Sequence, residues 1–245
     1  MNNPVIIGKA TIYNCDCMEL LKATPDKFYD LAIVDPPYGI GAGSPSFVTD
    51  TTGVTQKNGK ILKIKSEYKA KNWDDKPPAD EYFIELFRVS KHQIIWGENF
   101  YSMNLGVGRI IWDKLNDHTD QYDCEIAFCS LSNRVDIVRY MWAGMMQGLQ
   151  VSKSSRSALI QQGNKSLNEQ RIHPTQKPVK LYEWLLTNYA KQGDKILDTH
   201  LGSGSHAIAC NNLGFEITAC ELDKDYYDAS IKRITQATAQ ERLFE

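Results

Sequence analysis

The sequence predicts an α/β fold, in which helices cover both faces of a mostly parallel seven-stranded sheet. First, short apolar runs rich in β-branched residues recur along the 245 residues. Second, segments with helical periodicity separate several of these runs, and such alternation builds parallel sheets. Third, a glycine turn at Gly202–Gly204 joins an apolar run to a helical segment. One domain of this length accommodates all three features, so we expect a single domain over residues 1–245.

Seven segments are expected to form the strands. Most carry consecutive apolar residues rather than strict alternation, which is typical of strands buried on both faces. In chain order they are Ala10–Cys15, Asp30–Val34, Gln93–Trp96, Arg109–Trp112, Cys124–Phe128, Lys195–Asp198 and Phe215–Cys220.

Five segments are expected to form helices. Asp80 is the expected N-cap of one, and Pro178 precedes another at a position where proline favours a helix start. In chain order they are Cys17–Lys22, Asp80–Val89, Val179–Lys191, Ser205–Leu213 and Tyr226–Thr235.

Two long polar regions, about 41–78 and about 140–173, interrupt this alternation. Loops of this length in a compact domain are usually functional or disordered, and Trp73 suggests that the first one can dock. The net charge is only −2, but residues 57–76 hold seven lysines, and residues 151–180 hold six Lys or Arg against one Glu. Such runs are often only solvated surface; here we favour contacts with nucleic-acid phosphates.

Composition excludes several classes of protein. No apolar stretch reaches the roughly 18–20 residues of a membrane helix, and the N-terminus lacks the pattern of a secretory signal. The six cysteines form no Cys-x-x-Cys pair and no usual zinc spacing. We therefore expect reduced thiols, no metal site and a cytoplasmic protein.

The most informative segment is Asp35-Pro36-Pro37-Tyr38-Gly39, which ends the second predicted strand. Open α/β sheets place ligands at the carboxyl ends of strands, so the Asp35 carboxylate should face a ligand. Each proline fixes its own backbone and restrains the residue before it. A fixed carboxylate, a fixed carbonyl on Pro36 and the face of Tyr38 could together hold a planar amino group. The alternative is a proline-rich turn with Tyr38 packed beside it.

A second site is expected around the glycine turn. Gly202 and Gly204 allow a sharp turn and a close approach to a ligand, although Gly-x-Gly alone often marks only a tight turn. Glu221 ends the next predicted strand, where a carboxylate can accept both hydroxyls of a ribose. Asp16 ends another and could receive an adenine amino group. The phosphate-loop pattern is absent, which favours S-adenosylmethionine over NAD or ATP.

With these motifs, the chain resembles the β-class amino-methyltransferases of DNA, which modify adenine N6 or cytosine N4 with S-adenosylmethionine. Besides Asp16 and Glu221, the resemblance rests on the Asp-Pro-Pro-Tyr box, the block His173–Pro178 and the turn Asp198–Ser205. The catalytic box precedes the cofactor turn, which is the family's circularly permuted order. One departure is His200, where family members often have a phenylalanine.

The resemblance implies a Rossmann-like fold, double-stranded DNA as partner, a possible homodimer and no membrane association. It implies the catalytic residues Asp35, Pro36, Pro37 and Tyr38, with Tyr38 stacked on a flipped base. The implied cofactor residues are Asp16, Cys17, Asp35, Thr175, Lys177, Pro178, Asp198, His200, Leu201, Gly202, Ser203, Gly204, Glu221 and Leu222. The DNA-contact candidates are Lys63, Lys65, Lys114, Lys153 and Arg156, and for Lys114 a solvated strand end is the alternative.

These features favour a DNA adenine N6-methyltransferase, either stand-alone or associated with phage or restriction systems. Cytosine N4 methylation uses the same chemistry, but the family's cytosine enzymes favour Ser before Pro-Pro-Tyr, whereas this chain has Asp35. Protein and RNA methyltransferases more typically show Asn-Pro-Pro-Tyr. A non-catalytic nucleic-acid-binding module is the remaining alternative, and it predicts a degenerate site.

Overall fold

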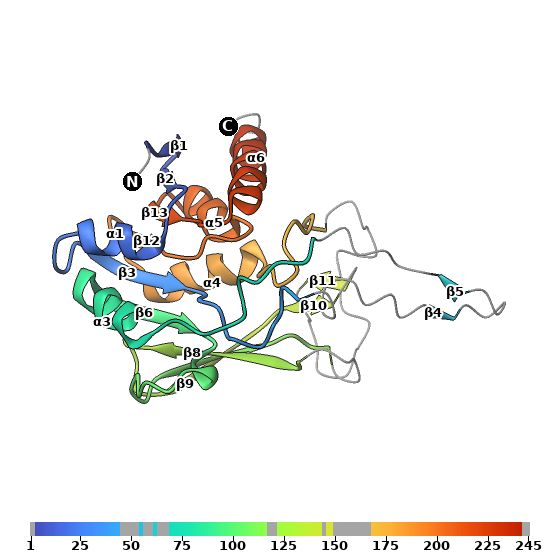
Figure 1. The fold of residues 1–245 in the computed structure, drawn as a ribbon, viewed down its shortest axis with the longest axis horizontal. Coiled ribbons are helices and arrows are strands. Elements are labelled where there is room, and N and C mark those ends of the chain that lie inside the picture. The colour runs from blue at the N-terminus through green and yellow to red at the C-terminus, as the bar shows by residue number, and fades with distance from the viewer. Residues whose placement is uncertain are drawn as a thin grey trace.

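The computed structural model describes residues 3–44, 54, 55, 61, 62, 69–116, 122–143, 146–148 and 168–241. Within them, one large sheet has the strand order β1-β2-β13-β12-β3-β6-β8-β7-β9 (Figure 1). Two short antiparallel pairs lie outside it: β4 (Val54–Thr55) with β5 (Ile61–Leu62), and β10 (Met141–Ala143) with β11 (Met146–Gly148).

The sheet is mostly parallel, as expected. Only β1 and β8 run antiparallel to their neighbours in it. The bounds of its strands are β1 Val5–Ile7, β2 Ala10–Tyr13, β3 Tyr29–Val34, β6 Ser90–Trp96, β7 Arg109–Asp113, β8 Cys124–Cys129, β9 Val135–Arg139, β12 Lys195–Asp198 and β13 Glu216–Cys220.

The expectation of seven strands was too low, because the described sheet has nine. All seven predicted strands are present, and β1 and β9 extend the two edges. Both are short edge strands, and β9 leaves Val135 60% exposed and Ile137 43% exposed. Both segments contain β-branched residues that favour strands, but they are short, and the prediction did not include them.

The five predicted helices are also present, with small differences at their ends. They are α1 Cys17–Ala23, α3 Asp80–Val89, α4 Val179–Tyr189, α5 Ser205–Leu213 and α6 Lys224–Glu241. The prediction of Asp80 as an N-cap was wrong: Ala79 is the cap, without a side-chain hydrogen bond, and Asp80 begins the first turn. A carboxylate there still favours the helix through its dipole.

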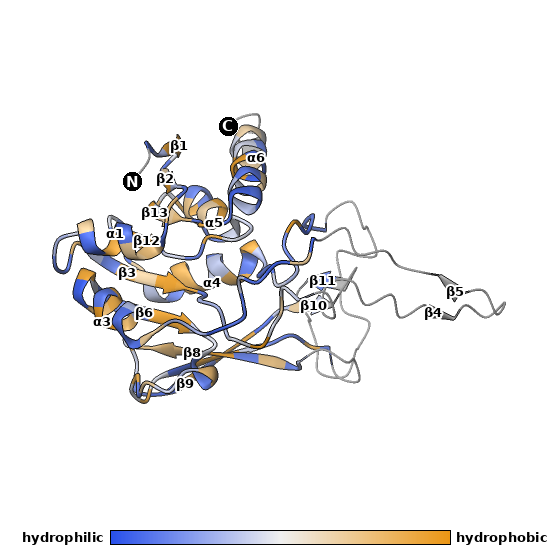
Figure 2. Ribbon diagram, in the orientation of Figure 1, coloured by the Kyte–Doolittle hydropathy of each residue, from blue (hydrophilic) through white to orange (hydrophobic). Residues whose placement is uncertain are grey.

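Helices cover both faces of the sheet, and β3 shows why. Leu31 and Ile33 belong to the core cluster that includes α4, α5 and α6, whereas Ala32 and Val34 point to the cluster that includes α1 and α3. A strand with alternate residues in two cores must be apolar throughout. Figure 2 accordingly shows strong hydrophobic colour along the central strands.

This arrangement positions a site at one edge of the sheet. The parallel strands β2, β13, β12, β3 and β6 end there, and Asp16, Glu221, Asp198 and Asp35 occur at or just after four of these ends. Ligand sites of open α/β sheets form at such an edge. Among the described residues, no helix is both long and apolar enough to span a membrane.

Candidate active site

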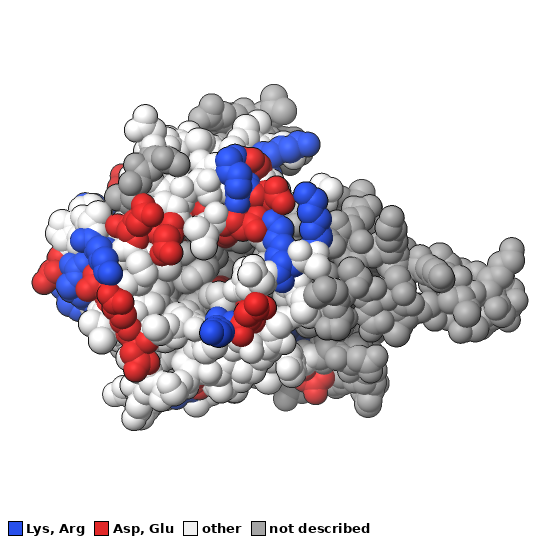
Figure 3. Space-filling model, viewed as in Figure 1, with Lys and Arg blue, Asp and Glu red and all other residues white. Residues whose placement is uncertain are grey.

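A cleft of about 730 Å³ lies at this edge of the sheet. Figure 3 shows the surface hollowed near the middle of the view, with acidic and basic side chains beside the hollow. The predicted residues that line the cleft are Asp16, Cys17, Asp35, Pro36, Pro37, Tyr38, Lys114, Thr175, Lys177, His200, Leu201, Gly202, Ser203, Glu221 and Leu222. Pro178, Asp198 and Gly204 are not in the cleft wall: Pro178 and Gly204 are the N-caps of α4 and α5, and Asp198 is 2% exposed beneath the turn.

The Asp35 carboxylate lies between a lysine and a phenol. Its Oδ2 is 2.6 Å from Lys177 Nζ, and its Oδ1 accepts a hydrogen bond of 2.7 Å from the Tyr38 hydroxyl. The Tyr101 hydroxyl is 3.0 Å from the Pro36 carbonyl and 3.0 Å from the Trp96 carbonyl. Asp35 and Pro36 therefore present fixed acceptors at the cleft, each already near a donor of the protein.

Glu125, on β8, joins this arrangement and was not foreseen from the sequence. Its carboxylate is 2.9 Å from Lys177 Nζ and 2.6 Å from Lys114 Nζ. Lys114 is thus an ion-paired wall residue with a 12% exposed side chain, and its predicted contact with DNA remains a prediction. The only hint of Glu125 was a single charge within an otherwise apolar strand segment.

The charges of this cluster shift its pKa values in opposite directions. Burial would raise the pKa of Glu125, but Lys177 and Lys114 lower it to about 2. Burial raises the pKa of Asp35 despite Lys177, and the nearby Glu125 raises it further. Burial would lower the pKa of Lys177, but the two carboxylates raise it above its usual value. Lys177 therefore remains an ammonium at neutral pH.

Tyr38 packs in a space that a glycine provides. Its ring stacks on Phe100, in the short 3-10 helix η1 (Glu98–Phe100), with centroids 5.0 Å apart and an interplanar angle of 13°. Gly97 has φ +73°, and a Cβ there would lie 2.1 Å from the Tyr38 ring. Only glycine satisfies both the backbone and the contact at this position.

Asp74 holds the turn that follows the catalytic box. Its buried carboxylate accepts backbone N–H groups of Tyr38 (2.6 Å), Gly39 (2.9 Å), Ile40 (3.3 Å) and Ala42 (2.8 Å). Hydrogen bonds to a charged acceptor are stronger than neutral ones. The end of the first insertion therefore fixes the conformation of residues 38–42.

On the other side of the cleft, Glu221 organises the glycine turn. Its two carboxylate oxygens accept the N–H groups of Gly202 (2.8 Å) and Asp223 (2.9 Å). Gly202 has φ +54°, a conformation that favours glycine, and a Cβ there would make only an ordinary contact, 3.9 Å from the His200 carbonyl. Burial raises the pKa of Glu221 to about 7, although the hydrogen bonds from the two backbone N–H groups lower it. The carboxylate retains free lone pairs toward the cleft for a further donor.

His200 presents a flat, uncharged ring to the same cleft. Burial lowers its pKa to about 4. Its Nδ1 is 2.9 Å from Thr199 Oγ1, its Nε2 is 4.0 Å from Cys17 Sγ, and it packs edge-on against Tyr82. A neutral imidazole can pack against a ligand as an aromatic residue does.

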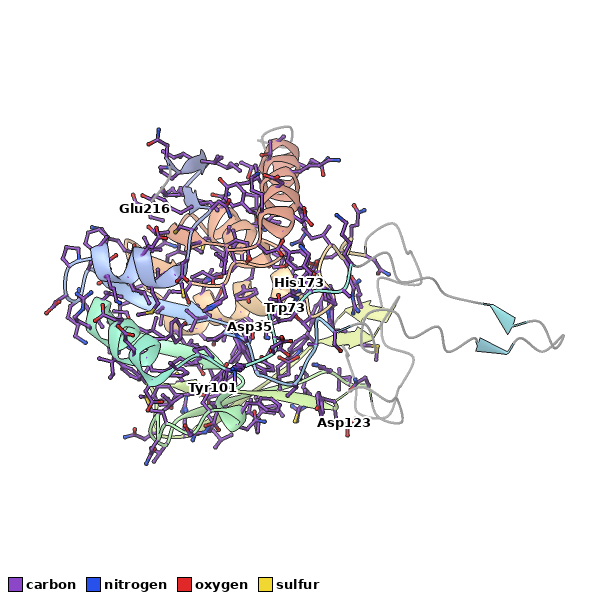
Figure 4. The ribbon with its side chains drawn as sticks, in the orientation of Figure 1. Asp35, Trp73, Tyr101, Asp123, His173 and Glu216 are labelled. Atoms are coloured by element: carbon purple, nitrogen blue, oxygen red, sulfur yellow. The ribbon has the colours of Figure 1, made fainter. Side chains whose placement is uncertain are left out.

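The His173–Pro178 block closes the remaining side. His173 is buried and packs against Trp73 and Tyr226, with ring centroids 5.0 Å and 4.2 Å away, so the docking of Trp73 is confirmed. Burial lowers the pKa of His173 to about 3, so its Nδ1 accepts the N–H of Thr175 (3.3 Å). Figure 4 shows Asp35, Trp73 and His173 around the centre of the site.

Two charged residues outside the predicted set connect these parts. Arg233, on α6, donates to the Ser203 carbonyl (2.8 Å) and to Glu169 (2.9 Å). Glu169 in turn accepts the N–H of Val179 at 2.9 Å, at the start of α4. The glycine turn and the end of the His173–Pro178 block are thereby joined. The other predicted DNA contacts, Lys63, Lys65, Lys153 and Arg156, lie outside the described residues.

The protein is therefore a Rossmann-like α/β protein with a ligand site at the carboxyl edge of its sheet, where a glycine turn and the Asp35 carboxylate line one cleft. More specifically, the chain belongs to the DNA methylase family N6_N4_Mtase, whose family model matches residues 95–232, more than half of the chain. The Asp35-Pro36-Pro37-Tyr38 box precedes the matched region, so its catalytic role remains a prediction.

Similar proteins agree with this family. The Type II methyltransferase M2.DpnII of Streptococcus pneumoniae is 22% identical, over 93% of this chain and 90% of that protein. The structure of the M1.HpyAVI–SAM complex has a TM-score of 0.50 at 20% identity, covering 91% of this chain and 99% of the other. The PvuII DNA methyltransferase, described as cytosine-N4-specific, has a TM-score of 0.52 at 11% identity, with coverage of 95% and 92%. At these identities, the two structures establish the shared fold.

Proposed function

We propose that this chain transfers a methyl group from S-adenosylmethionine to the exocyclic N6 of an adenine flipped out of double-stranded DNA. The observation that carries the proposal is that the Asp35 carboxylate and the Pro36 carbonyl line the same cleft as Glu221 and Gly202. One cleft therefore offers acceptors for an amino group and a nucleoside-binding turn. We also retain a homodimer as a prediction, which light scattering of the purified chain tests.

The residues on the Glu221 side fit the nucleoside part of S-adenosylmethionine. Gly202 lines the cleft without a side chain, so a ligand can approach its backbone closely. The Glu221 carboxylate can accept ribose hydroxyls beyond its two backbone donors. His200 offers a neutral flat ring, and Asp16 lines the same cleft. When bound, the cofactor supplies a methyl group on a positively charged sulfur, which is a good leaving group.

The residues of the catalytic box would act on the amino group of the base. Its nitrogen is a weak nucleophile because its lone pair is delocalised into the ring. Accepting the two N–H groups at the Asp35 carboxylate and the Pro36 carbonyl favours a pyramidal nitrogen with an available lone pair. The proton that becomes acidic during transfer then passes to Asp35 or to water. Positioning and electrostatics in a closed cleft supply most of the acceleration.

Adenine is favoured over cytosine because Asp precedes Pro-Pro-Tyr, as in the adenine enzymes that the chain resembles. Cytosine N4 is the second candidate, since the PvuII enzyme with a similar fold is described as cytosine-N4-specific. Both bases present an amino group to the same acceptors, so the site chemistry is shared. The distinction requires product analysis.

The test is to incubate the purified chain with duplex DNA and isotopically labelled S-adenosylmethionine, then identify the modified nucleoside by mass spectrometry. We expect N6-methyladenine; N4-methylcytosine would favour the second candidate, and no modified base would contradict both. Methylation-sensitive sequencing of DNA from expressing cells identifies the target sequence.

The variant Asp35→Ala tests the catalytic box directly. We expect methyl transfer to fall about 100-fold or more, because one of two acceptors at the reacting nitrogen is lost. The affinity for S-adenosylmethionine, measured by calorimetry, should remain close to that of the parent. Activity within about threefold of the parent would exclude this role for Asp35.

A further inference from the structure

We propose that Glu125 is a positioning residue for methyl transfer, which holds the Lys177 ammonium when the Asp35 carboxylate turns to the target amino group. This inference rests on the proposed function, because it requires Asp35 to accept an N–H of the substrate. It assigns a role to a residue on β8, far in sequence from the catalytic box.

The first argument is the burial of Lys177. Its side chain is 3% exposed, and its Nζ lies 2.6 Å from Asp35 Oδ2 and 2.9 Å from Glu125 Oε2. A buried ammonium without a partner is strongly disfavoured. If Asp35 were its only charged partner, engaging the substrate would leave Lys177 with the neutral Tyr38 hydroxyl at 3.0 Å. Because Glu125 is already in contact, Asp35 can release Lys177 while the ammonium keeps an ion pair.

The second argument is the balance of charge in the cluster. Asp35 and Glu125 contribute two carboxylates, and Lys177 and Lys114 contribute two ammonium groups. Lys114 holds Oε1 of Glu125 at 2.6 Å, whereas Lys177 contacts the other oxygen, Oε2. Without Glu125, Asp35 would be the one carboxylate among the described residues left in contact with the Lys177 ammonium. That carboxylate would then be held more firmly by the protein and be less available to the base.

The third argument concerns the groups that face Asp35. Burial raises the pKa of Tyr38, Tyr101 and Tyr182, so these phenols stay protonated at neutral and acidic pH. Burial lowers the pKa of His173 to about 3, so this imidazole stays neutral above that value. Glu125 loses its proton at about pH 2, whereas burial raises the pKa of Asp35. We therefore assign the pH dependence of this cluster to Asp35.

The experiment measures single-turnover methylation as a function of pH for the parent chain and Glu125→Gln. We expect the plateau rate of the variant to fall about 10-fold or more, as for loss of a positioned charged partner. We also expect the acid limb of its pH–rate profile, where the rate falls at low pH, to move to lower pH. The reason is that removing the Glu125 charge removes an interaction that raises the pKa of Asp35. S-adenosylmethionine affinity should not change. A slower variant whose acid limb stays at the parent's pH would overturn the proposal, since a merely structural defect gives that result.

Glu183→Gln is the matched control. The Glu183 side chain is 15% exposed, against 18% for Glu125, and it pairs with Lys180 on α4 outside the cleft. This variant should keep the parent's rate and acid limb. If Glu125→Gln does not fold by circular dichroism, Glu125→Asp replaces it. Its charge recedes from Lys177 and from Asp35, so the rate should fall and the acid limb should move to lower pH by less than in Glu125→Gln. An unmoved limb would overturn the proposal here as well.

A double variant shows whether Glu125→Gln slows methylation through Lys177 or through a general disturbance of the site. In the Lys177→Met background, Glu125→Gln should change the rate less than about threefold, because the partner that it positions is gone. Additive effects of the two substitutions would overturn the proposal. Suppose that the parent methylates DNA, Asp35→Ala is inactive and Glu125→Gln behaves like the parent. The role of Glu125 is then rejected, while the proposed function stands. A parent that forms no methylated base rejects the proposed function and this inference with it.

Discussion

Ionisation of the Glu221 carboxyl group should make both cofactor affinity and the free energy of unfolding depend on pH, and substitutions of Glu221 test this. Its pKa is raised to about 7 by burial, so near neutral pH the charged and neutral forms coexist. The charged form is the better acceptor for ribose hydroxyls. Affinity for S-adenosylmethionine should therefore increase as pH rises to about 7 and level off above it. Glu221→Ala should remove this dependence.

The magnitude follows from the hydrogen bond that is lost. A hydrogen bond to a charged group contributes about 1.5–3 kcal/mol, so Glu221→Ala should raise the Kd at pH 8 by about 10-fold to about 150-fold. The free energy of unfolding should depend on pH in the opposite direction from cofactor affinity, decreasing as pH rises. The fold favours neutral Glu221, so ionisation between the usual 4.5 and about 7 costs the native state up to about 3 kcal/mol. This contribution is fully present below pH 4.5 and is lost as pH rises through 7.

Two measurements check this reasoning. Calorimetric titration at pH 6, 7 and 8 gives the Kd of the parent and Glu221→Ala. Urea unfolding of the parent and Glu221→Gln at several pH values from 4.5 to 8 gives the free energy of unfolding. For Glu221→Gln, which cannot ionise, the decline of stability between pH 4.5 and 7 should flatten. A Kd within about threefold of the parent would show that Glu221 does not bind the cofactor. An unchanged pH slope of stability in Glu221→Gln would show that its carboxyl group is not the titrating one.

Three further outcomes are expected. Asp74→Asn should lower the free energy of unfolding by about 2–3 kcal/mol and slow methylation, because it removes a charged acceptor of the 38–42 turn; a change within about 0.5 kcal/mol in urea unfolding would contradict this. Tyr38→Phe should move the acid limb of the methylation rate to higher pH, because the lost hydroxyl donates to Asp35 and lowers its pKa; an unmoved limb would refute it. If both insertions bind DNA, replacing four of their basic residues with Ala should reduce the steepness of log DNA affinity against log salt by about 3.6, with cofactor affinity unchanged. If the variant keeps the parent's salt dependence, these side chains only solvate the loops. The four positions are Lys63, Lys65, Lys153 and Arg156.

The fold was predictable because its signals are local. Strand β3 reads as apolar throughout, since its alternate residues enter two cores, and α5 follows directly from a glycine turn. Both are properties of a few consecutive residues. The edge strand β9 was missed although Val135, Ile137 and Val138 are β-branched, because among the described strands it pairs only with β7 and leaves Val135 and Ile137 exposed.

The candidate site was predictable only in its separate parts. Asp35 and Glu221 are found from strand ends, because the carboxyl ends of parallel strands meet at one edge. Glu125 could not be assigned in this way, since it is inside β8, which runs antiparallel to its neighbours. Its side chain reaches the site because β8 lies between β6 and β7. That order of strands is a property of the whole fold and not of the residues around position 125.

The end of the first insertion shows how the two halves of the site are joined. Asp74 binds the 38–42 turn beside the target side of the cleft, while Lys71, three residues earlier, pairs with Asp223 at 2.6 Å, two residues after Glu221. One short segment thus contacts both the turn after the catalytic box and the loop after the cofactor strand. Because a displacement of either contact moves the same backbone, we infer that the sequence-based division into a core and a DNA-binding insertion is too simple. Residues 71–74 belong to the site itself, whatever the preceding lysines bind.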